Sequence, residues 1–291
     1  MEYVMSQLLS KAYEGKYAVP AICVSNMESV LACFIAAKQA AAPIIIQSAY
    51  SEMEPQMITY RDLAGMIRCF GERFPEVAYA IHLDHGMSEQ ECMDALDGGF
   101  PSVMYDGSSL SFEDNVKITG RLKKAAGTDR TVEAEVGKVG GEEGKGDGKC
   151  HIIKSEPKQL KEFLERTGAD AVAVSIGNVH GSRGCDKMVP NLDFGLLRQL
   201  NQACSVPLVL HGASGIPEDD IRKAVTMGIC KINYYTQLYN VYMDCVKENI
   251  ALTMEECMGK ATEVLAEEIK KIILICGAQN KALGEAGKES L

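Results

Sequence analysis

Four of the five histidines in this 291-residue chain lie where a short apolar segment ends. His82 and His85 belong to the stretch AIHLDHG, His180 ends SIGNVH, and His211 ends LVLH. Three imidazoles that leave one coordination position open form a typical catalytic zinc site. The pattern therefore indicates metal chemistry, on the condition that the fold brings these segment ends to one place.

Acidic residues occur at the ends of the same kind of segment. Asp84 precedes His85, and Asp106 follows the run SVMY. Glu133 and Glu135 alternate in TVEAEV, so both side chains point to one face of a strand. A carboxylate that is buried without a partner costs several kcal/mol. A metal ion or a bound substrate would supply the partners that these four acids need.

The rest of the chain alternates short apolar segments with amphipathic helical segments. The apolar segments are typical of parallel strands that are buried on both faces, and the sequence predicts them at 17–24, 42–49, 79–85, 102–107, 131–137, 170–177, 206–212 and 230–236. Helices are predicted at 27–40, 56–74, 88–98, 111–126, 157–167, 193–203 and 217–227. Eight such alternations without a dividing linker indicate an α/β fold, a (β/α)8 TIM barrel that forms one domain over residues 1–291. A long helical tail, about residues 237–287, is expected after the last strand.

In a (β/α)8 barrel the chemistry gathers at the C-terminal ends of the strands, where all these histidines and acids fall. The glycine-rich, charged segment 137–151 cannot pack in a core, so it is predicted to be a mobile loop on the same face. A surface insertion without function is the alternative for this segment. HGASG (211–215) and KINYYT (231–236) lie at the ends of the seventh and eighth strands, where barrels commonly bind phosphate.

The net charge of −10 and the pI of about 5.1 bear on the class of partner. Nucleic acids and anionic membranes need basic patches, so neither is an expected partner. A small anionic substrate remains compatible with this charge, because a few backbone N–H groups and one cation can hold a phosphate.

The eleven cysteines are irregularly spaced and contain no C-x-x-C pair. We interpret them as reduced thiols of a cytoplasmic protein, in preference to a disulfide framework or a cysteine-rich zinc site. No apolar stretch reaches the roughly 18 residues that a membrane span needs, and the N-terminus has no signal-peptide pattern.

Two longer motifs resemble the signatures of a known family, the class II, metal-dependent ketose-bisphosphate aldolases, which include fructose-bisphosphate and tagatose-bisphosphate aldolases. YAIHLDHG (79–86) is similar to the first signature and VEAEVGKVGGEE (132–143) to the second. GNVHG, LVLHGASGIP and KIN-YT follow in the order of the family, and the likeness covers about residues 1–240. It implies an aldolase that reversibly cleaves a ketose 1,6-bisphosphate or a ketose 1-phosphate into dihydroxyacetone phosphate and an aldehyde.

The resemblance also implies a set of metal ligands. His85, His180 and His211 would hold a catalytic Zn²⁺ ion. Asp106 and Glu135 match positions that bind a second or alternative divalent ion in relatives. A monovalent cation, Na⁺ or K⁺, is usual near the substrate phosphate in the family.

Catalytic and binding roles follow from the same resemblance. Asp84 would be the general acid and base at the broken bond, and Glu143, on the glycine-rich loop, would move the proton at the dihydroxyacetone-phosphate carbon. His82 lies in the signature without being a ligand, so we expect it to support the ligands. The donor half and its phosphate would bind residues that follow the sixth, seventh and eighth strands, namely Gly181, Gly212, Ala213, Ser214, Asn233, Tyr234, Tyr235 and Thr236.

The chain departs from the family in two places. Relatives usually continue the second zinc histidine as H-G-x-Y-K-G, whereas this chain reads HGSRGCDK, so Arg183 or Lys187 would have to replace the lysine. The segment 237–262 is acidic and has only Lys247 and Lys260 as cations, where relatives carry basic residues for the distal phosphate, partly across a dimer. A ketose 1-phosphate is therefore an alternative to a bisphosphate, and a homodimer or homotetramer is expected.

Two other functions fit part of the pattern. One is a non-catalytic barrel subunit that stabilises a partner tagatose-bisphosphate aldolase, although the retention of every histidine and carboxylate argues against it. The other is a hydrolase that uses zinc-bound hydroxide on a barrel of the same kind.

Overall fold

The computed structural model describes residues 1–141, 152–180 and 190–283 of the chain. Within these ranges eight parallel strands close into a barrel in sequence order, and the last strand pairs with the first. The strands are β1 (Val19–Cys23), β2 (Ile44–Ala49), β3 (Tyr79–Gly86), β4 (Ser102–Tyr105), β5 (Thr131–Val136), β6 (Ala171–Val174), β7 (Leu208–Leu210) and β8 (Ile229–Tyr234). The predicted (β/α)8 barrel is confirmed, with strand ends shifted by at most three residues.

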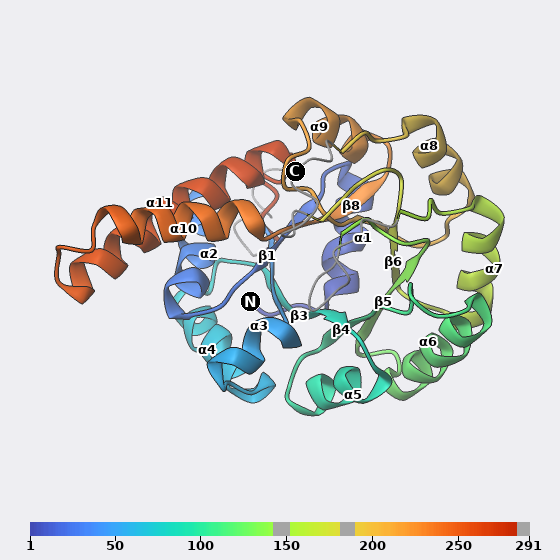
Figure 1. Ribbon diagram of the computed structural model, residues 1–291, viewed down its shortest axis with the longest axis horizontal. Helices are drawn as coiled ribbons and strands as arrows, with labels where there is room; N and C mark the ends of the chain where they lie inside the picture. Colours follow the sequence, from blue (N-terminus) through green and yellow to red (C-terminus); the bar gives the residue numbers. More distant parts are fainter. Residues whose placement is uncertain (142–151, 181–189, 284–291) are drawn as a thin grey trace.

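Helices cover the outside of the barrel (Figure 1). They are α1 (Met5–Gly15), α2 (Met27–Ala40), α3 (Tyr50–Met53), the short 3-10 helix η1 (Glu54–Gln56), α4 (Tyr60–Arg73), α5 (Glu89–Asp97), α6 (Phe112–Ala126), α7 (Pro157–Thr167), α8 (Phe194–Ala203), α9 (Glu218–Thr226), α10 (Thr236–Glu248) and α11 (Met254–Ile275). The prediction at 56–74 was wrong in its first residues, because Met57 has a φ of +56° and ends η1 before Thr59 caps α4.

Helix α1, which the sequence did not predict, lies at the end of the barrel where the strands begin. The backbone N–H of Ser6 donates to Thr131 Oγ1 at 3.0 Å, and the Ser102 hydroxyl donates to Met5 Sδ at 3.6 Å. Ser102 and Thr131 are the first residues of β4 and β5. The opposite end of the barrel therefore remains for a site.

The interior of the barrel is unusually polar. Such interiors are generally filled with Val, Ile and Leu, but here alternate positions of four strands carry polar or charged side chains. All of them are buried: Gln47 of β2, His82 and Asp84 of β3, Glu133 and Glu135 of β5, and Lys231 and Asn233 of β8. The apolar core instead fills the space between the strands and the helices.

The predicted C-terminal tail is helical from Thr236 to Glu248 and from Met254 to Ile275, whereas residues 284–287 of that prediction lie outside the described ranges. Figure 1 shows α10 and α11 side by side, projecting from the barrel next to α2. Their connection exposes Ile250 and Met254, which are 77% and 75% accessible. Among the described helices, none combines the length and the apolar character that crossing a bilayer requires.

Candidate active site

The end of β3 turns His85 into the barrel mouth. Leu83 pairs with Val103 and Gly86 with Tyr105, so β3 carries one extra residue between these two pairs. His85 lies in that bulge with a φ of +43°, a left-handed conformation that is strained for a histidine. Bulges next to active sites re-aim side chains, and here the bulge breaks the alternation that would otherwise send His85 outward.

His180 and His211 are held by the loops that follow β6 and β7. The buried side chain of Asn178 donates to the carbonyl of His211 at 2.9 Å and accepts from the N–H of Ile176 at 2.8 Å. Gly212 has a φ of +65°, and a Cβ there would lie 2.5 Å from the carbonyl oxygen of Val179. This close approach of backbones, which glycine permits, brings the two histidine-bearing loops together.

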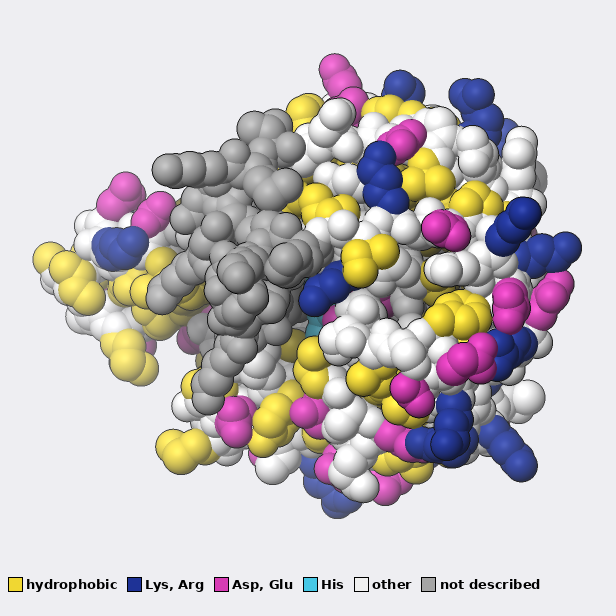
Figure 2. Space-filling view, turned by 45° about the vertical axis from the view of Figure 1, so that its right-hand side comes forward, with side chains coloured by type: hydrophobic (Ala, Val, Ile, Leu, Met, Phe, Trp, Pro, Cys, Tyr) yellow, Lys and Arg dark blue, Asp and Glu magenta, His cyan; other side chains and the backbone are white. Residues whose placement is uncertain are grey.

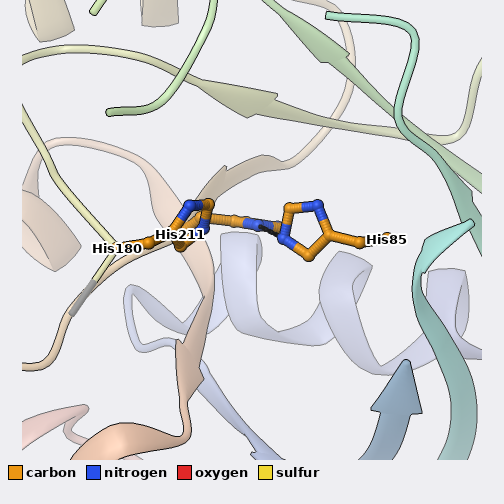
Figure 3. A group of neighbouring side chains, drawn as sticks. All are labelled: His85, His180 and His211. Carbon is orange, nitrogen blue, oxygen red and sulfur yellow. Dashed lines mark hydrogen bonds between the residues drawn. The ribbon is translucent and has the colours of Figure 1, made fainter. Parts of the chain in front are cut away.

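The three rings meet at the barrel mouth, as Figure 3 shows. Ring centroids of His85 lie 5.1 Å from those of His180 and 4.6 Å from those of His211, and His180 and His211 are 5.8 Å apart. One nitrogen of each ring lies within 4.8 Å of the other two. The structure therefore brings together the three histidines that the sequence singled out.

We assign the proton-bearing nitrogens of two rings from their hydrogen bonds to carboxylates. His85 Nδ1 lies 3.0 Å from an oxygen of Asp106, and His211 Nε2 lies 3.0 Å from an oxygen of Glu133. Carboxylate oxygens are natural acceptors, so we assign the ring protons to these two nitrogens. The lone pairs of His85 Nε2 and His211 Nδ1 then face each other at 2.8 Å. Facing lone pairs repel unless a cation lies against both, so this donor set fits a metal ion.

The charge of the site also fits a divalent ion. Burial first, and the neighbouring His85 second, hold the pKa values of His180 and His211 well below 6.5. Both rings are therefore neutral at pH 7, which is the form that binds metals. Burial is the largest influence and would raise the pKa of Asp106, but the hydrogen bond and charge of His85 and the hydrogen bonds of Ser108 together outweigh it and lower that pKa.

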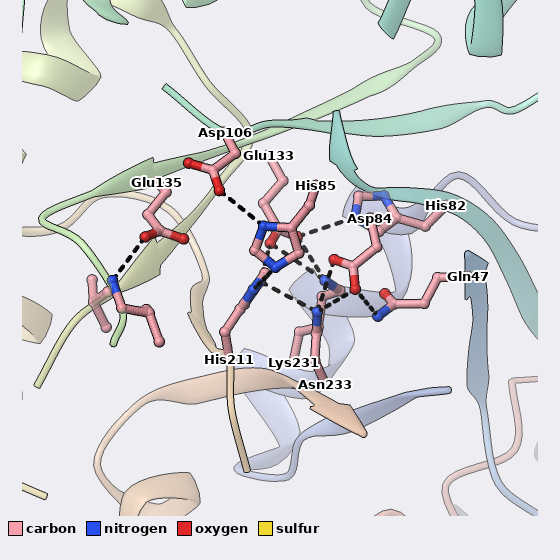
Figure 4. Close-up of polar contacts among 12 residues, drawn as sticks. Gln47, His82, Asp84, His85, Asp106, Glu133, Glu135, His211, Lys231 and Asn233 are labelled. Atoms are coloured by element: carbon pink, nitrogen blue, oxygen red, sulfur yellow. Dashed lines mark hydrogen bonds and ion pairs between the residues drawn. The ribbon is translucent and has the colours of Figure 1, made fainter. Parts of the chain in front are cut away.

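Asp84 lies beside the imidazoles with both oxygens engaged (Figure 4). Gln47 Nε2 donates to Oδ2 at 2.7 Å, and Asn233 Nδ2 donates to Oδ1 at 2.9 Å. Burial raises the pKa of Asp84, but His85, Lys231 and His211 together outweigh burial and leave that pKa lowered. Asp84 is thus a carboxylate at neutral pH, fixed in place and able to accept a proton.

Glu135 forms a second group with His85 and Asp106, whose candidate ligand atoms also lie within 4.8 Å of one another. Burial, followed by the negative charge of Asp106, raises the pKa of Glu135 to about 8. One of its oxygens accepts from the N–H of Val139 at 3.0 Å, and the other is buried without a hydrogen-bond partner among the described residues. Near neutral pH this side chain is therefore largely an uncharged acid.

Several polar residues of the site were missed or left without a role by the sequence analysis. Gln47 and Lys231 each interrupt a buried apolar strand, a signal that could have revealed them. Glu133 was noticed only for its alternation with Glu135. Asn178 carried no recognisable signal, because an asparagine in a loop is ordinary. Its hydrogen bond to the carbonyl of His211 depends on tertiary structure.

The structure describes all but one of the predicted substrate-binding residues, and they lie in different places. Gly212, Ala213 and Ser214 follow β7 beside His211, and Asn233 points into the barrel. Tyr234 follows Asn233 on β8, so its side chain points to the other face of the strand, away from the imidazoles. The charged and polar groups that act on its buried hydroxyl are Cys276, Glu218 and Arg222, which lie outside the barrel interior. Tyr235 and Thr236 lie at the start of α10. Glu143, Gly181, Arg183 and Lys187 lie outside the described residues.

A (β/α)8 barrel with neutral imidazoles and buried carboxylates converging at its strand ends has the site of a metal-dependent barrel enzyme. Comparison with known proteins gives the family. Residues 3–281 match the family described as "Fructose-bisphosphate aldolase class-II". A fructose-bisphosphate aldolase of Geobacillus stearothermophilus is 36% identical over 251 residues, which cover 85% of this chain and 85% of the relative.

Two further relatives extend over almost the whole chain. A probable fructose-bisphosphate aldolase of Bacillus subtilis is 35% identical over 288 residues, 96% of this chain and 98% of the relative. The crystal structure of the YdjI aldolase of Escherichia coli K12 is 31% identical, with a TM-score of 0.86 over 97% of this chain and 100% of that one. The chain belongs to the class II fructose-bisphosphate aldolase family and is an aldolase, a carbon–carbon lyase. The comparisons give no support to the alternative of a non-catalytic subunit.

His82 offers a test of the electrostatics at the barrel interior. Burial first, and Lys231 second, hold its pKa well below 6.5. In the metal-free protein the unfolded chain therefore protonates His82 below pH 6.5, whereas the folded chain keeps the ring neutral. The free energy of unfolding falls as the pH falls. Replacing this ring removes about 1.4 kcal/mol of that loss between pH 7.5 and 5.5.

The measurement compares urea unfolding of the wild type and His82→Gln, in chelator, at both pH values. The difference between the two proteins is the readout, because Glu135, whose pKa is raised to about 8, shifts wild-type stability in the opposite direction. An equal pH dependence in both proteins would show that the folded and unfolded chains protonate His82 over the same pH range, so that its pKa is not lowered.

Proposed function

We propose that this aldolase is zinc-dependent, that His85, His180 and His211 hold the ion, and that it reversibly cleaves a phosphorylated ketose into dihydroxyacetone phosphate and an aldehyde. The observation that carries the proposal is the pair of imidazole nitrogens, His85 Nε2 and His211 Nδ1, which face each other at 2.8 Å beside the buried carboxylate of Asp84. A divalent ion held there supplies Lewis-acid stabilisation for the negative charge that develops on the donor half as the carbon–carbon bond breaks.

Asp84 is proposed to move the proton at the reacting hydroxyl. In cleavage a base must take the hydroxyl proton as the carbon–carbon bond breaks, and in condensation the same group returns it. The lowered pKa keeps Asp84 ionised at neutral pH, ready to accept. Gln47 and Asn233 each donate to it, so the carboxylate cannot rotate freely.

Glu143 is proposed to move the proton at the donor carbon, as its place in the second signature implies. Support comes from the residues at the start of its loop. Gly140 forms a bridge with Val179, and its carbonyl accepts from the N–H of His180 at 2.7 Å. The chain that leads to Glu143 therefore begins beside the third imidazole.

The donor half and its phosphate are proposed to bind after β6, β7 and β8, at Gly181, Gly212, Ala213, Ser214, Asn233, Tyr234, Tyr235 and Thr236, with a monovalent cation nearby. A helix N-terminus attracts an anion through its free N–H groups. Helix α10 has no acidic residue in its first turn, whereas α9 has Glu218, Asp219 and Asp220 there. The start of α10 is thus the more favourable binding site for the phosphate. Tyr234 contributes only its backbone, because its side chain faces away.

A second divalent ion is proposed to bind His85, Asp106 and Glu135. Its affinity should rise with pH, because the ion must displace the proton that burial keeps on Glu135.

The aldehyde half is proposed to need no distal phosphate. Lys247 lies eleven residues after Thr236 in α10, about 16 Å away at the rise of an α-helix. It pairs with Asp244 at 2.9 Å, and Lys260 donates to Asn249 at 3.1 Å. Neither lysine of the segment 237–262 is placed to bind a phosphate at the barrel mouth of its own chain.

The whole chain is proposed to act as one catalytic domain in a cytoplasmic homodimer or homotetramer. The structure joins none of the described cysteines in a disulfide, as expected in a reducing compartment. Figure 2 shows hydrophobic side chains at the projecting end of the molecule, where Ile250, Leu252 and Met254 are exposed. Exposed apolar patches mark interaction sites, and a single-chain mass by light scattering would contradict the oligomer.

Zinc content tests the ligand set. His85→Ala, His180→Ala and His211→Ala should each lose the ion and reduce turnover at least about 1,000-fold, since the two remaining imidazoles cannot hold it tightly. The measurement is zinc per chain by mass spectrometry after gel filtration, with His151→Ala as the matched control that keeps one ion. One full equivalent of zinc in any of the three ligand variants would refute the set.

Asp84→Asn separates chemistry from binding. The amide keeps the shape of the carboxylate but cannot accept the hydroxyl proton, so kcat should fall about 10²–10⁴-fold while zinc stays bound. Asp129→Asn, at an exposed aspartate, is the control and should retain full turnover. Near-normal kcat in the Asp84 variant would assign the proton transfer to another group.

Side-by-side kinetics test the substrate. Lys247 and Lys260 contact other side chains of α10 and its connection to α11. We therefore expect kcat/KM for fructose 1,6-bisphosphate to exceed that for fructose 1-phosphate by less than about tenfold. A tenfold ratio corresponds to roughly 1.4 kcal/mol, about one surface interaction. A preference of several hundredfold would mean that a distal-phosphate site exists.

A further inference from the structure

An ion pair lies inside the barrel close to the three imidazoles. Lys231 Nζ is 3.0 Å from Oε2 of Glu133 and 3.3 Å from its Oε1. Both side chains are fully buried. Neither residue belongs to the two groups of candidate metal ligands.

Stability alone does not explain this pair. Removing a lysine and a glutamate from water costs more than their attraction returns unless the remaining hydrogen-bonding capacity is also used. The interior of a barrel is ordinarily filled with aliphatic side chains that would pack at less cost. The pair therefore needs a reason in what its members contact.

The carboxylate of Glu133 is shared among three groups from three other strands or strand ends. Its Oε1 accepts from His211 Nε2 at 3.0 Å, and its Oε2 lies 3.5 Å from His82 Nε2. Lys231 contacts both oxygens (Figure 4). The lysine thus holds the carboxylate in the orientation in which one oxygen meets His211.

That contact decides which nitrogen His211 offers to the mouth of the barrel. With its proton on Nε2, directed at Glu133, His211 presents the lone pair of Nδ1 to His85 Nε2 at 2.8 Å. Without a fixed acceptor at Glu133 the ring could adopt the other tautomer or rotate, and the lone pair would leave the site.

The same strand links this contact to Asp84. Asn233 lies two residues after Lys231 on β8, so both side chains point inward. Its Nδ2 donates to Asp84 at 2.9 Å. Strand β8 therefore carries both the cation that orients Glu133 and a hydrogen-bond donor to the proposed base.

We propose that Lys231 and Glu133 are positioning residues that act as a unit: Lys231 orients the Glu133 carboxylate, and the carboxylate fixes the His211 ring for metal binding. The inference rests on the proposed zinc site. It concerns residues that make no contact with the ion, so its test uses the affinity for the metal alone.

The experiment measures zinc affinity of metal-free protein by competition with a chromophoric chelator. Partners of a ligating histidine typically change metal affinity 10–100-fold, so Glu133→Gln and Lys231→Met should each weaken zinc binding by about that factor. The double variant should bind no more weakly than the worse single variant, because the two residues act through one contact. Lys123→Met, which breaks the 2.8 Å pair with Asp170 at the surface, is the matched control and should leave affinity unchanged.

Unchanged zinc affinity in Lys231→Met, or losses that multiply in the double variant, would overturn the proposal. Should Lys231→Met fail to fold because its glutamate is left unpaired, the double variant decides, since it removes both charges. A folded double variant with wild-type affinity also overturns it.

A spectroscopic readout separates positioning from general destabilisation. With Co²⁺ in place of zinc, the visible absorption band should shift in Glu133→Gln and Lys231→Met because the His211 ring moves, and it should not shift in Lys123→Met. An unshifted band in both site variants contradicts the proposal. Failure of the wild type to bind zinc or Co²⁺ at all would instead contradict the proposed function.

Discussion

The structure depends on two imidazole nitrogens that face each other across 2.8 Å, His85 Nε2 and His211 Nδ1. The assignment from the carboxylate contacts places each proton on the other nitrogen of its ring. Two unprotonated nitrogens this close repel each other without a cation between them. The surrounding structure must therefore hold the two rings in place. The bulge that gives His85 its φ of +43° and the close packing at Gly212 are two parts of that enforcement. Strain of this kind persists only where many contacts over-determine it.

The polar interior of the barrel follows from the same constraint. The rings of His85 and His211 each need an acceptor for the proton on the nitrogen that faces away from the other ring. Asp106 supplies it to His85, and Glu133 supplies it to His211. A buried acceptor in turn needs a donor or a cation, which Lys231 supplies to Glu133. Most of the barrel's usual aliphatic filling is therefore replaced near the mouth by paired polar groups, while the apolar core outside the strands holds the fold together.

The sequence predicted the barrel because eight apolar segments alternate with amphipathic ones, a local pattern that survives without tertiary information. Because strand ends of a parallel barrel share one face, it also predicted that His82, His85, His180 and His211 lie on that face, and the family resemblance singled out the last three. It could not predict the bulge at His85, the bonds of Asn178 or the pairing of Lys231 with Glu133, whose partners lie 98 residues apart in the chain. Helix α1 was not predicted because it precedes the first strand and so lies outside the alternation of strands and helices.

X-ray absorption at the zinc edge of the purified wild-type protein tests the central claim most directly. The account predicts one zinc per chain whose nearest neighbours are nitrogen and oxygen at about 2.0–2.1 Å, with the outer-shell scattering of three imidazoles. The chain also has eleven cysteines. Sulfur neighbours at about 2.3 Å, or fewer than three imidazoles, would contradict it.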